Sequence, residues 1–262
     1  MIIEKWLMLP ATELILVISL LFGATATLLC LLSFSRITRN HVQVFRGISA
    51  SFNGSIVPIL AILIGFLSSD VWESNKKAAD LVREEAAELT SIYGLVAVSD
   101  LPYIEISWGI RNYVSAVVDK EWPAMTRGEA ASEAEIAQDH LIRIASNGCS
   151  TRQTGDRCNK ALADIAMKLR ETRSDRLKLS SDNTETIKWA SVVFLALIAQ
   201  VSIAILHIER IGPQIATLTI FSSAIVIVLG LIALHELPFA PPLVVKPTPL
   251  ADLLYIIPDG AS

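Results

Sequence analysis

Residues 14–34 read LILVISLLFGATATLLCLLSF, a stretch of twenty-one residues whose only ionisable side chain is Cys30. A helix rises about 1.5 Å per residue, so about 20 apolar residues cross the ~30 Å hydrocarbon core of a bilayer. A cleaved secretory signal is disfavoured, because eight mostly apolar residues follow the tripeptide Ala24-Thr25-Ala26. The stretch therefore predicts an uncleaved membrane-spanning helix.

Three further stretches are apolar enough to lie in hydrocarbon. Residues 189–206 read WASVVFLALIAQVSIAIL, and residues 215–234 read IATLTIFSSAIVIVLGLIAL. The shortest, residues 56–67, reads IVPILAILIGFL and extends through small and weakly polar residues over 48–72. We therefore expect an all-α integral membrane protein with four transmembrane helices and a large helical insert between the second and third. The predicted division is a first hairpin (1–67), an extramembrane insert (68–188), a second hairpin (189–236) and a C-terminal tail (237–262).

The charges are concentrated in the insert. Of the 48 formal charges in the chain, 36 lie between residues 68 and 188. The net charge of −4 and the lack of a basic stripe argue against a nucleic-acid partner. The lipid bilayer is the partner that the hydropathy pattern predicts.

Helical periodicity continues through the insert. Apolar residues recur on one face of residues 70–96, which we expect to continue the second crossing without a break. Further helices are expected over residues 102–120 and 132–147, and a fourth begins at Asp156. We therefore expect an antiparallel set of helices.

Two features bear on orientation. Arg36, Arg39 and Arg46 lie in the short connection between the first two crossings, and arginine-rich short loops stay in the cytoplasm. The insert would then face the periplasm of a bacterial inner membrane. Cys149 and Cys158 flank a polar loop that a disulfide can close in an oxidising compartment. Two unpaired thiols are the alternative.

One face of the second crossing combines small and hydroxyl-bearing residues. They recur at intervals of four and three residues, which places them in a line along a helix. Such a line suits the wall of an ion pathway, and it equally suits close helix packing. The acidic Asp70 and Glu73 follow it and would form an ion-attracting ring in an oligomer. The candidate pore-lining residues are Ser51, Ser55, Pro58, Ile62, Gly65 and Ser69.

Catalytic and metal-binding patterns are missing from the sequence. It contains no glycine-rich phosphate loop, nucleophile elbow or histidine cluster. His207 and His235 lie at opposite ends of the fourth crossing. Two side chains that far apart cannot bind the same metal ion in a helical hairpin. We therefore expect neither an enzyme nor a cofactor-binding or metal-binding protein.

Several motifs together resemble the bacterial bestrophin-like domain family, over about residues 14–254. The resemblance implies the layout of four crossings with a central helical insert, and kinship with bestrophins, which are pentameric anion channels. It implies no catalytic residue. Neither a bestrophin-type hydrophobic neck nor an acidic calcium clasp is apparent in the sequence. The resemblance therefore does not indicate which ion the protein would conduct. The motifs are Ile64-Gly65-Phe66-Leu67, Val71-Trp72-Glu73, Glu84-Glu85-Ala86-Ala87-Glu88-Leu89, Tyr93, Tyr113, residues 117–125 (VVDKEWPAM), Arg173, Arg176, Leu177, Leu237-Pro238-Phe239 and residues 244–249 (VVKPTP).

Three functional hypotheses follow. The first is a homo-oligomeric channel or pore for inorganic ions, with the second crossing lining the path and a pentamer suggested by the resemblance. The second is a non-conducting membrane scaffold or sensor whose insert binds a partner protein. The third is a transporter with a midplane site, for which Gln200 and Asn53 are the strongly polar groups available.

Overall fold

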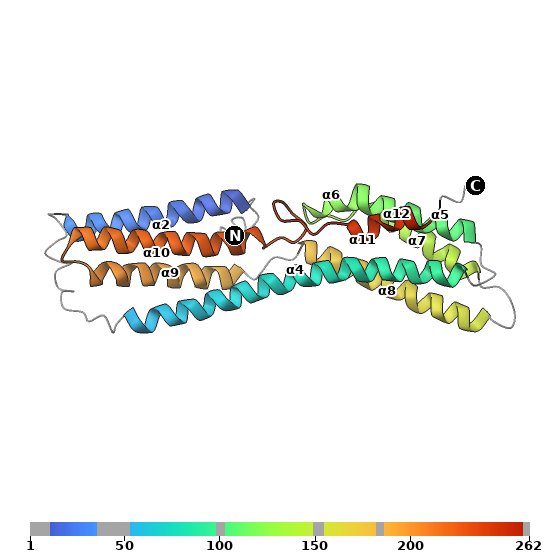
Figure 1. Cartoon of the computed structure of the whole chain (residues 1–262), viewed down its shortest axis with the longest axis horizontal. Helices are drawn as coiled ribbons and strands as arrows, with labels where there is room; N and C mark the ends of the chain where they lie inside the picture. The colour runs from blue at the N-terminus through green and yellow to red at the C-terminus, as the bar shows by residue number, and fades with distance from the viewer. Residues whose placement is uncertain (1–10, 36–52, 98–102, 149–154, 182–185, 259–262) are drawn as a thin grey trace. The chain divides into compact units, whose positions relative to one another are not determined.

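The computed structural model describes residues 11–35, 53–97, 103–148, 155–181 and 186–258. Within these residues the chain is helical and contains no strand (Figure 1), which confirms the predicted all-α class. The elements are α2 (Ala11–Phe34), α4 (Asn53–Ala97), α5 (Tyr103–Ala116), the π-helix η3 (Val117–Glu121), α6 (Trp122–Met125), α7 (Ser132–Gly148), α8 (Gly155–Ser181), α9 (Thr186–Leu206), α10 (Ile211–Leu234), α11 (Thr248–Ala251) and α12 (Leu253–Ile256).

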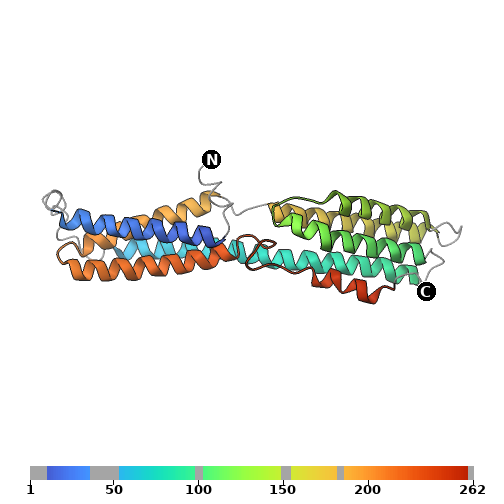
Figure 2. The ribbon, with the colours of Figure 1, turned by 90° about the horizontal axis from the view of Figure 1, so that it is seen from above.

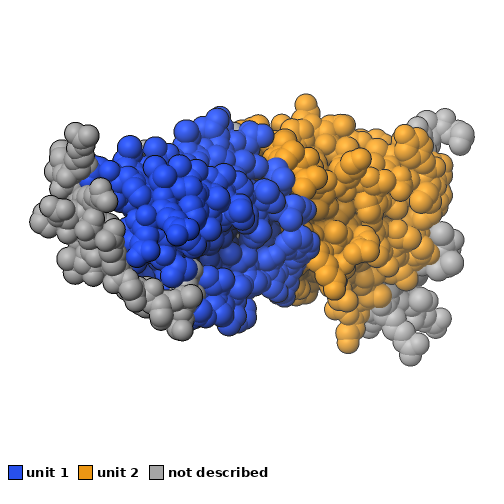
Figure 3. All heavy atoms as spheres, turned by 60° about the vertical axis from the view of Figure 1, so that its left-hand side comes forward, with its two compact units in different colours: residues 1–73, 183–236 blue, residues 74–182, 237–262 orange. Residues whose placement is uncertain are grey.

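The chain forms two compact units (Figure 3). One unit, which we call the membrane unit, contains Met1–Glu73 and Asn183–Glu236. The other, which we call the insert unit, contains Ser74–Asp182 and Leu237–Ser262. The second unit thus combines the central insert with the C-terminal segment.

Four of the described helices are long and apolar enough to cross a bilayer. They are α2, the first part of α4, α9 and α10, so the protein is an integral membrane protein as predicted. In the membrane unit α2 and α10 run side by side (Figures 1 and 2). Gly230 permits a close approach there, because a Cβ at this position would lie 3.3 Å from Cγ1 of Ile15. The centre of the unit is filled by Ile18, Phe22, Leu67, Trp189 and Leu229, each at most 1% exposed.

Helix α4 is 45 residues long and continues from the second hydrophobic segment into the insert. The expectation of an unbroken helix is therefore confirmed. Pro58 lies inside it and has no N–H to donate to the carbonyl of Gly54. Membrane helices tolerate such a proline where neighbouring groups or water satisfy the freed carbonyl.

The insert unit packs the second part of α4 with α5, α7 and α8 around an apolar core. Periodic apolar side chains drive this packing, as the sequence predicts. Between α5 and α6 the chain widens into the π-helix η3, in which Val117 and Glu121 are buried. A π-turn inserts an extra residue and so changes the direction in which the following side chains point. The core includes Val82, Leu89, Ile106, Ile110, Tyr113, Val117, Leu141 and Leu169.

The C-terminal segment packs onto this core. Phe239, Leu250 and Leu253 are at most 4% exposed. Two side chains hold the segment by hydrogen bonds. Arg111 Nη1 donates to the carbonyls of Leu254 and Ile257, the latter at 2.7 Å, and Trp122 Nε1 donates to Val245 O at 3.2 Å. The tail is thus an ordered part of the insert unit up to the last described residues.

Candidate functional site

The predicted pore-lining residues lie on one exposed side of α4. Ser55, Pro58, Ile62, Gly65 and Ser69 are all exposed in the single chain, with Ile62 at 58%. At 3.6 residues per turn they lie opposite the buried face of the same helix. That buried face is formed in the membrane unit by Leu60, Leu67 and Val71. We call the exposed line the small-residue face; its remaining predicted member, Ser51, lies outside the described residues.

The small-residue face is not packed against another described helix of the chain. A Cβ built on Gly65 would meet no atom within 4 Å, and the same holds for Gly54 near the start of the helix. Close helix packing, the alternative explanation for small residues, would fill that space. Within the described part of the chain the small residues are therefore not explained by internal packing.

The two acidic residues that follow the small-residue face differ in their surroundings. Asp70 Oδ2 lies 2.8 Å from Lys188 Nζ on α9, and both side chains are about two-fifths exposed. Glu73 is exposed. Near them, the rings of Trp72 and His235 stack with centroids 5.3 Å apart. This end of the membrane unit thus carries polar and aromatic side chains, which suits a membrane–water interface.

Hydrogen bonds around Gln200 connect the helices in the interior of the membrane unit. Its Nε2 donates to Phe22 O at 3.0 Å and to Ser222 Oγ at 2.9 Å. Its Oε1 accepts from Thr25 Oγ1 at 2.7 Å. These bonds join α2, α9 and α10, and they use both ends of the amide. Gln200 therefore serves helix association, while the side chain of Asn53 lies outside what the structure describes.

The proposed disulfide concerns residues at the edge of the described chain. Cys149 lies outside the described residues, and Cys158 lies in α8 without a described side chain. Arg36, Arg39 and Arg46, which carry the orientation argument, also lie outside them. The disulfide and the orientation stay predictions.

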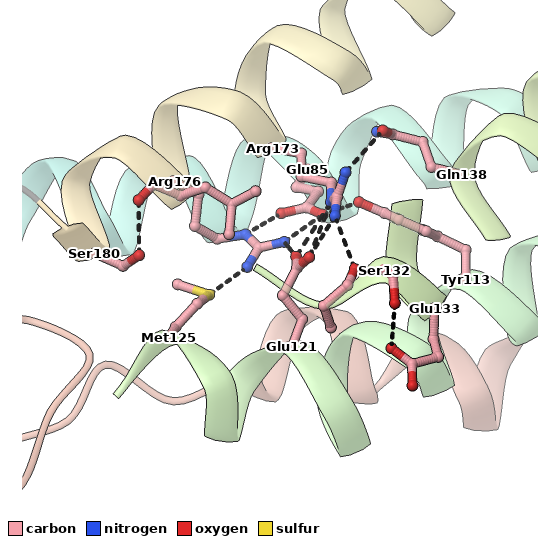
Figure 4. A network of polar contacts seen from close by, with 12 residues as sticks. Glu85, Tyr113, Glu121, Met125, Ser132, Glu133, Gln138, Arg173, Arg176 and Ser180 are labelled. Carbon is pink, nitrogen blue, oxygen red and sulfur yellow. Dashed lines mark hydrogen bonds and ion pairs between the residues drawn. The ribbon is translucent and has the colours of Figure 1, made fainter. Parts of the chain in front are cut away.

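A second polar site lies in the insert unit and consists of paired charges (Figure 4). Arg176 Nε lies 2.6 Å from Glu85 Oε2, and Arg176 Nη2 lies 2.8 Å from Glu121 Oε1. Arg173 Nη2 lies 2.5 Å from Glu121 Oε2. These four side chains are at most 8% exposed. Together with Tyr113, we call them the arginine cluster.

Further groups complete the hydrogen bonding of the arginine cluster. The hydroxyl of Tyr113 donates to Glu85 Oε1, and Arg176 Nη1 lies 2.7 Å from the sulfur of Met125. Burial raises the pKa of Tyr113 well above its ordinary value, and the negative charge of Glu85 adds to the increase. Burial alone would lower the pKa of Arg176, but Glu85 and the other acidic groups of the cluster outweigh it and raise that pKa. The tyrosine is therefore neutral and the arginine charged.

The arginine cluster is suited to holding helices together. Two guanidinium groups face two carboxylates, so the buried charges balance, as buried charges must. Its members come from α4, α5, η3 and α8, which are separated by up to 91 residues in the sequence. The arrangement fixes the relative position of these elements, and it offers no exposed nucleophile or base.

The sequence contains a signal for this cluster that apolar periodicity alone does not use. Glu85 lies three residues after Val82 and four before Leu89, on the apolar face of its helix. Arg173 lies four residues after Leu169, and Arg176 three residues further, on the buried face of α8. A charged residue on an apolar face predicts a buried partner. The sequence indicates no partner for Glu121, but in the structure this residue forms ion pairs with both Arg173 and Arg176.

The comparisons with known proteins agree with this architecture. A solved structure of a bacterial bestrophin homolog from Klebsiella pneumoniae, carrying a point mutation, matches with a TM-score of 0.64 and 12% sequence identity. The match covers 92% of this chain and 99% of the other, and at this identity it shows the fold alone. A search of curated proteins gives no match. The family model of the bestrophin-like domain matches residues 20–250. The chain therefore belongs to the bestrophin-like domain family.

Proposed function

We propose that the protein is a homo-oligomeric ion channel in which the small-residue face of α4 lines the path. The observation that carries this proposal is the exposure of Ser55, Gly65 and Ser69 on the side of α4 opposite its buried face. Small side chains leave room along an axis, and hydroxyl groups can replace part of the hydration shell of an ion.

The need for several copies follows from the packing of one copy. The interior of the membrane unit is filled by apolar side chains, and the polar groups of Gln200 are engaged in hydrogen bonds. A hydrated path therefore requires a surface that the single chain leaves open. Copies arranged around an axis, with the small-residue faces turned inward, supply such a path. Family membership and the fold match to a bestrophin homolog support this arrangement and are compatible with a pentamer.

The acidic residues at the end of the small-residue face affect whether the channel prefers cations or anions. Glu73 is exposed, and Asp70 is shared with Lys188. In a ring of subunits, copies of Glu73 form a belt of carboxylates that favours cations over anions. Asp70 contributes less negative charge to such a belt, because its carboxylate is paired.

We place the protein in the bacterial inner membrane with the insert in the periplasm. The support is the arginine-rich connection between the first two crossings and the disulfide expected between Cys149 and Cys158. A non-reducing gel tests the second point. We expect the protein to shift on reduction and the Cys149→Ser variant to show no shift; an unshifted wild-type protein would contradict the periplasmic placement.

The experiment for the channel is ion flux into liposomes that contain the purified protein. Gly65→Trp fills the proposed path and should abolish most of the flux while the oligomer persists. Gly23→Trp is the matched control, because Gly23 is also exposed, on α2, with no atom within 4 Å of its Cβ position. Equal flux in the two variants would contradict a path along α4. Absence of flux in the wild-type protein would favour the scaffold or sensor, whose insert binds a partner protein.

A further inference from the structure

A cleft of about 510 Å³ opens between α4 and α8 within the insert unit. Glu84 and Glu88 line it from α4, and Glu171 and Asp175 line it from α8. Lys168, also from α8, is the one basic side chain among the residues that line it. Carboxylates thus face each other across the cleft, and one cation is present to offset them.

Glu88 is the carboxylate whose contacts are incomplete. Its Oε1 accepts a hydrogen bond of 2.9 Å from Thr172 Oγ1, and Thr172 is 5% exposed. Its Oε2 is shielded from solvent and has no hydrogen-bond partner among the described residues. A buried carboxylate oxygen without a donor carries a desolvation cost that no contact offsets.

The neighbouring charged groups do not neutralise the negative charge of the Glu88 carboxylate. On α4, Glu84 is exposed and Glu85 is bonded to Arg176. The guanidinium of Arg176 is in turn shared with Glu121, so the arginine cluster has no positive charge to spare. From α8, Lys168 is attractive, Glu171 is exposed, and Asp175 pairs with Lys178 at 3.4 Å.

The burial of Glu88 and the charges near it also change the pKa of its carboxyl group. Burial raises its pKa above the ordinary value, and the charges of Glu85 and Glu84 raise it further. The hydrogen bond from Thr172 and the charge of Lys168 act in the opposite direction without cancelling the increase. The folded insert therefore binds this proton more tightly than the unfolded chain does.

We propose that Glu88 is a proton-operated switch at the contact between α4 and α8. When ionised, it leaves an uncompensated charge beside a cleft already rich in carboxylates. When protonated, it removes that charge and stabilises the contact. The stabilisation is fully present below the pKa of the unfolded chain and is lost as the pH rises through the higher folded pKa. The inference concerns the stability of the insert and does not depend on ion conduction.

The first test follows thermal unfolding of the full-length purified protein from about pH 8 to about pH 4, a range that spans the ordinary pKa of glutamate. Glu88→Gln imitates the protonated form, so its melting temperature at the upper pH should exceed that of the wild type by about 2–4 °C. The difference should vanish at the lower pH. Glu105→Gln and Glu135→Gln, exposed positions of the insert unit that do not line the cleft, should follow the wild type. A melting temperature of Glu88→Gln that is not raised at the upper pH would refute the switch.

A second test keeps the proposal open to refutation if Glu88→Gln does not fold. Thr172→Val removes the donor that favours the ionised form, so the midpoint of the stability profile should move to higher pH. Ser91→Ala, which also changes a hydroxyl beside the cleft, should leave the midpoint in place. The infrared difference spectrum of wild type minus Glu88→Gln should show a protonated carboxyl band already at a pH above the ordinary pKa of glutamate. An unmoved midpoint in Thr172→Val would contradict the proposal, as would the absence of that band from the difference spectrum.

Discussion

Arg176 Nε lies 2.6 Å from Glu85 Oε2, and neither side chain is exposed to solvent. The pair joins α8 to α4 across 91 residues of sequence. Buried ion pairs cost desolvation energy when they form, and removal of one partner leaves the other charge uncompensated. The pair therefore makes the fold of the insert unit sensitive to single substitutions.

Arg176→Met should lower the free energy of unfolding by about 3–5 kcal/mol, because the carboxylate of Glu85 remains buried without its cation. Urea unfolding followed by circular dichroism measures this loss. Arg170→Met is the control on the same helix, since Arg170 pairs with Asp139 at the surface with both side chains more than half exposed. An exposed pair contributes about 0–1 kcal/mol. Similar losses in both variants would contradict the special role of the buried pair.

Alkaline pH should destabilise the insert through Tyr113. Burial raises the pKa of Tyr113, with a further contribution from Glu85, so the folded chain keeps the phenolic proton that the unfolded chain releases near pH 10. This contribution is present below about pH 10 and is lost as the pH rises through the folded pKa. Tyr113→Phe should therefore show a shallower loss of stability above about pH 10 than the wild type. Tyr255→Phe, at a position 90% exposed, should keep the wild-type profile; a wild-type profile in Tyr113→Phe would disprove the linkage.

The C-terminal tail should loosen when Arg111 is replaced. Arg111→Gln removes the guanidinium that donates to the carbonyls of Leu254 and Ile257, and each such bond contributes about 1.5–3 kcal/mol. Limited proteolysis followed by mass spectrometry should then detect faster cleavage after residue 236. Lys246→Gln, at an exposed position of the same segment, serves as the control. Equal cleavage rates in the two variants would show that Arg111 does not hold the tail.

The helices follow from local sequence because their signals are local. Apolar runs of about twenty residues predict α2, α9 and α10, and periodic apolar positions predict the continuation of α4 past Trp72. These patterns depend on neighbours within a few turns, which sequence inspection captures. The ends of the helices differ from the predicted ends by a few residues, as at α10, which begins at Ile211.

The sites depend on contacts between distant residues and were harder to predict. Glu121 contacts Arg173 and Arg176 only because the π-helix and the packing of α8 bring them together. The packing of the tail onto the insert unit likewise depends on contacts between distant residues, such as the hydrogen bond from Arg111 to Ile257 O. The small-residue face could be located from spacing, but its exposure required the positions of the neighbouring helices.

The proposed channel function depends most on the small-residue face of α4 lining an ion path. Current through a planar bilayer tests this most directly, using Ser69→Cys in a chain whose Cys30, Cys149 and Cys158 are replaced by serine. We predict that a positively charged thiol reagent lowers the current carried by Ser69→Cys. The reagent should leave Ser19→Cys, at an exposed position of α2, unaffected. Unchanged current after complete modification of Ser69→Cys, verified by mass spectrometry, would contradict the account.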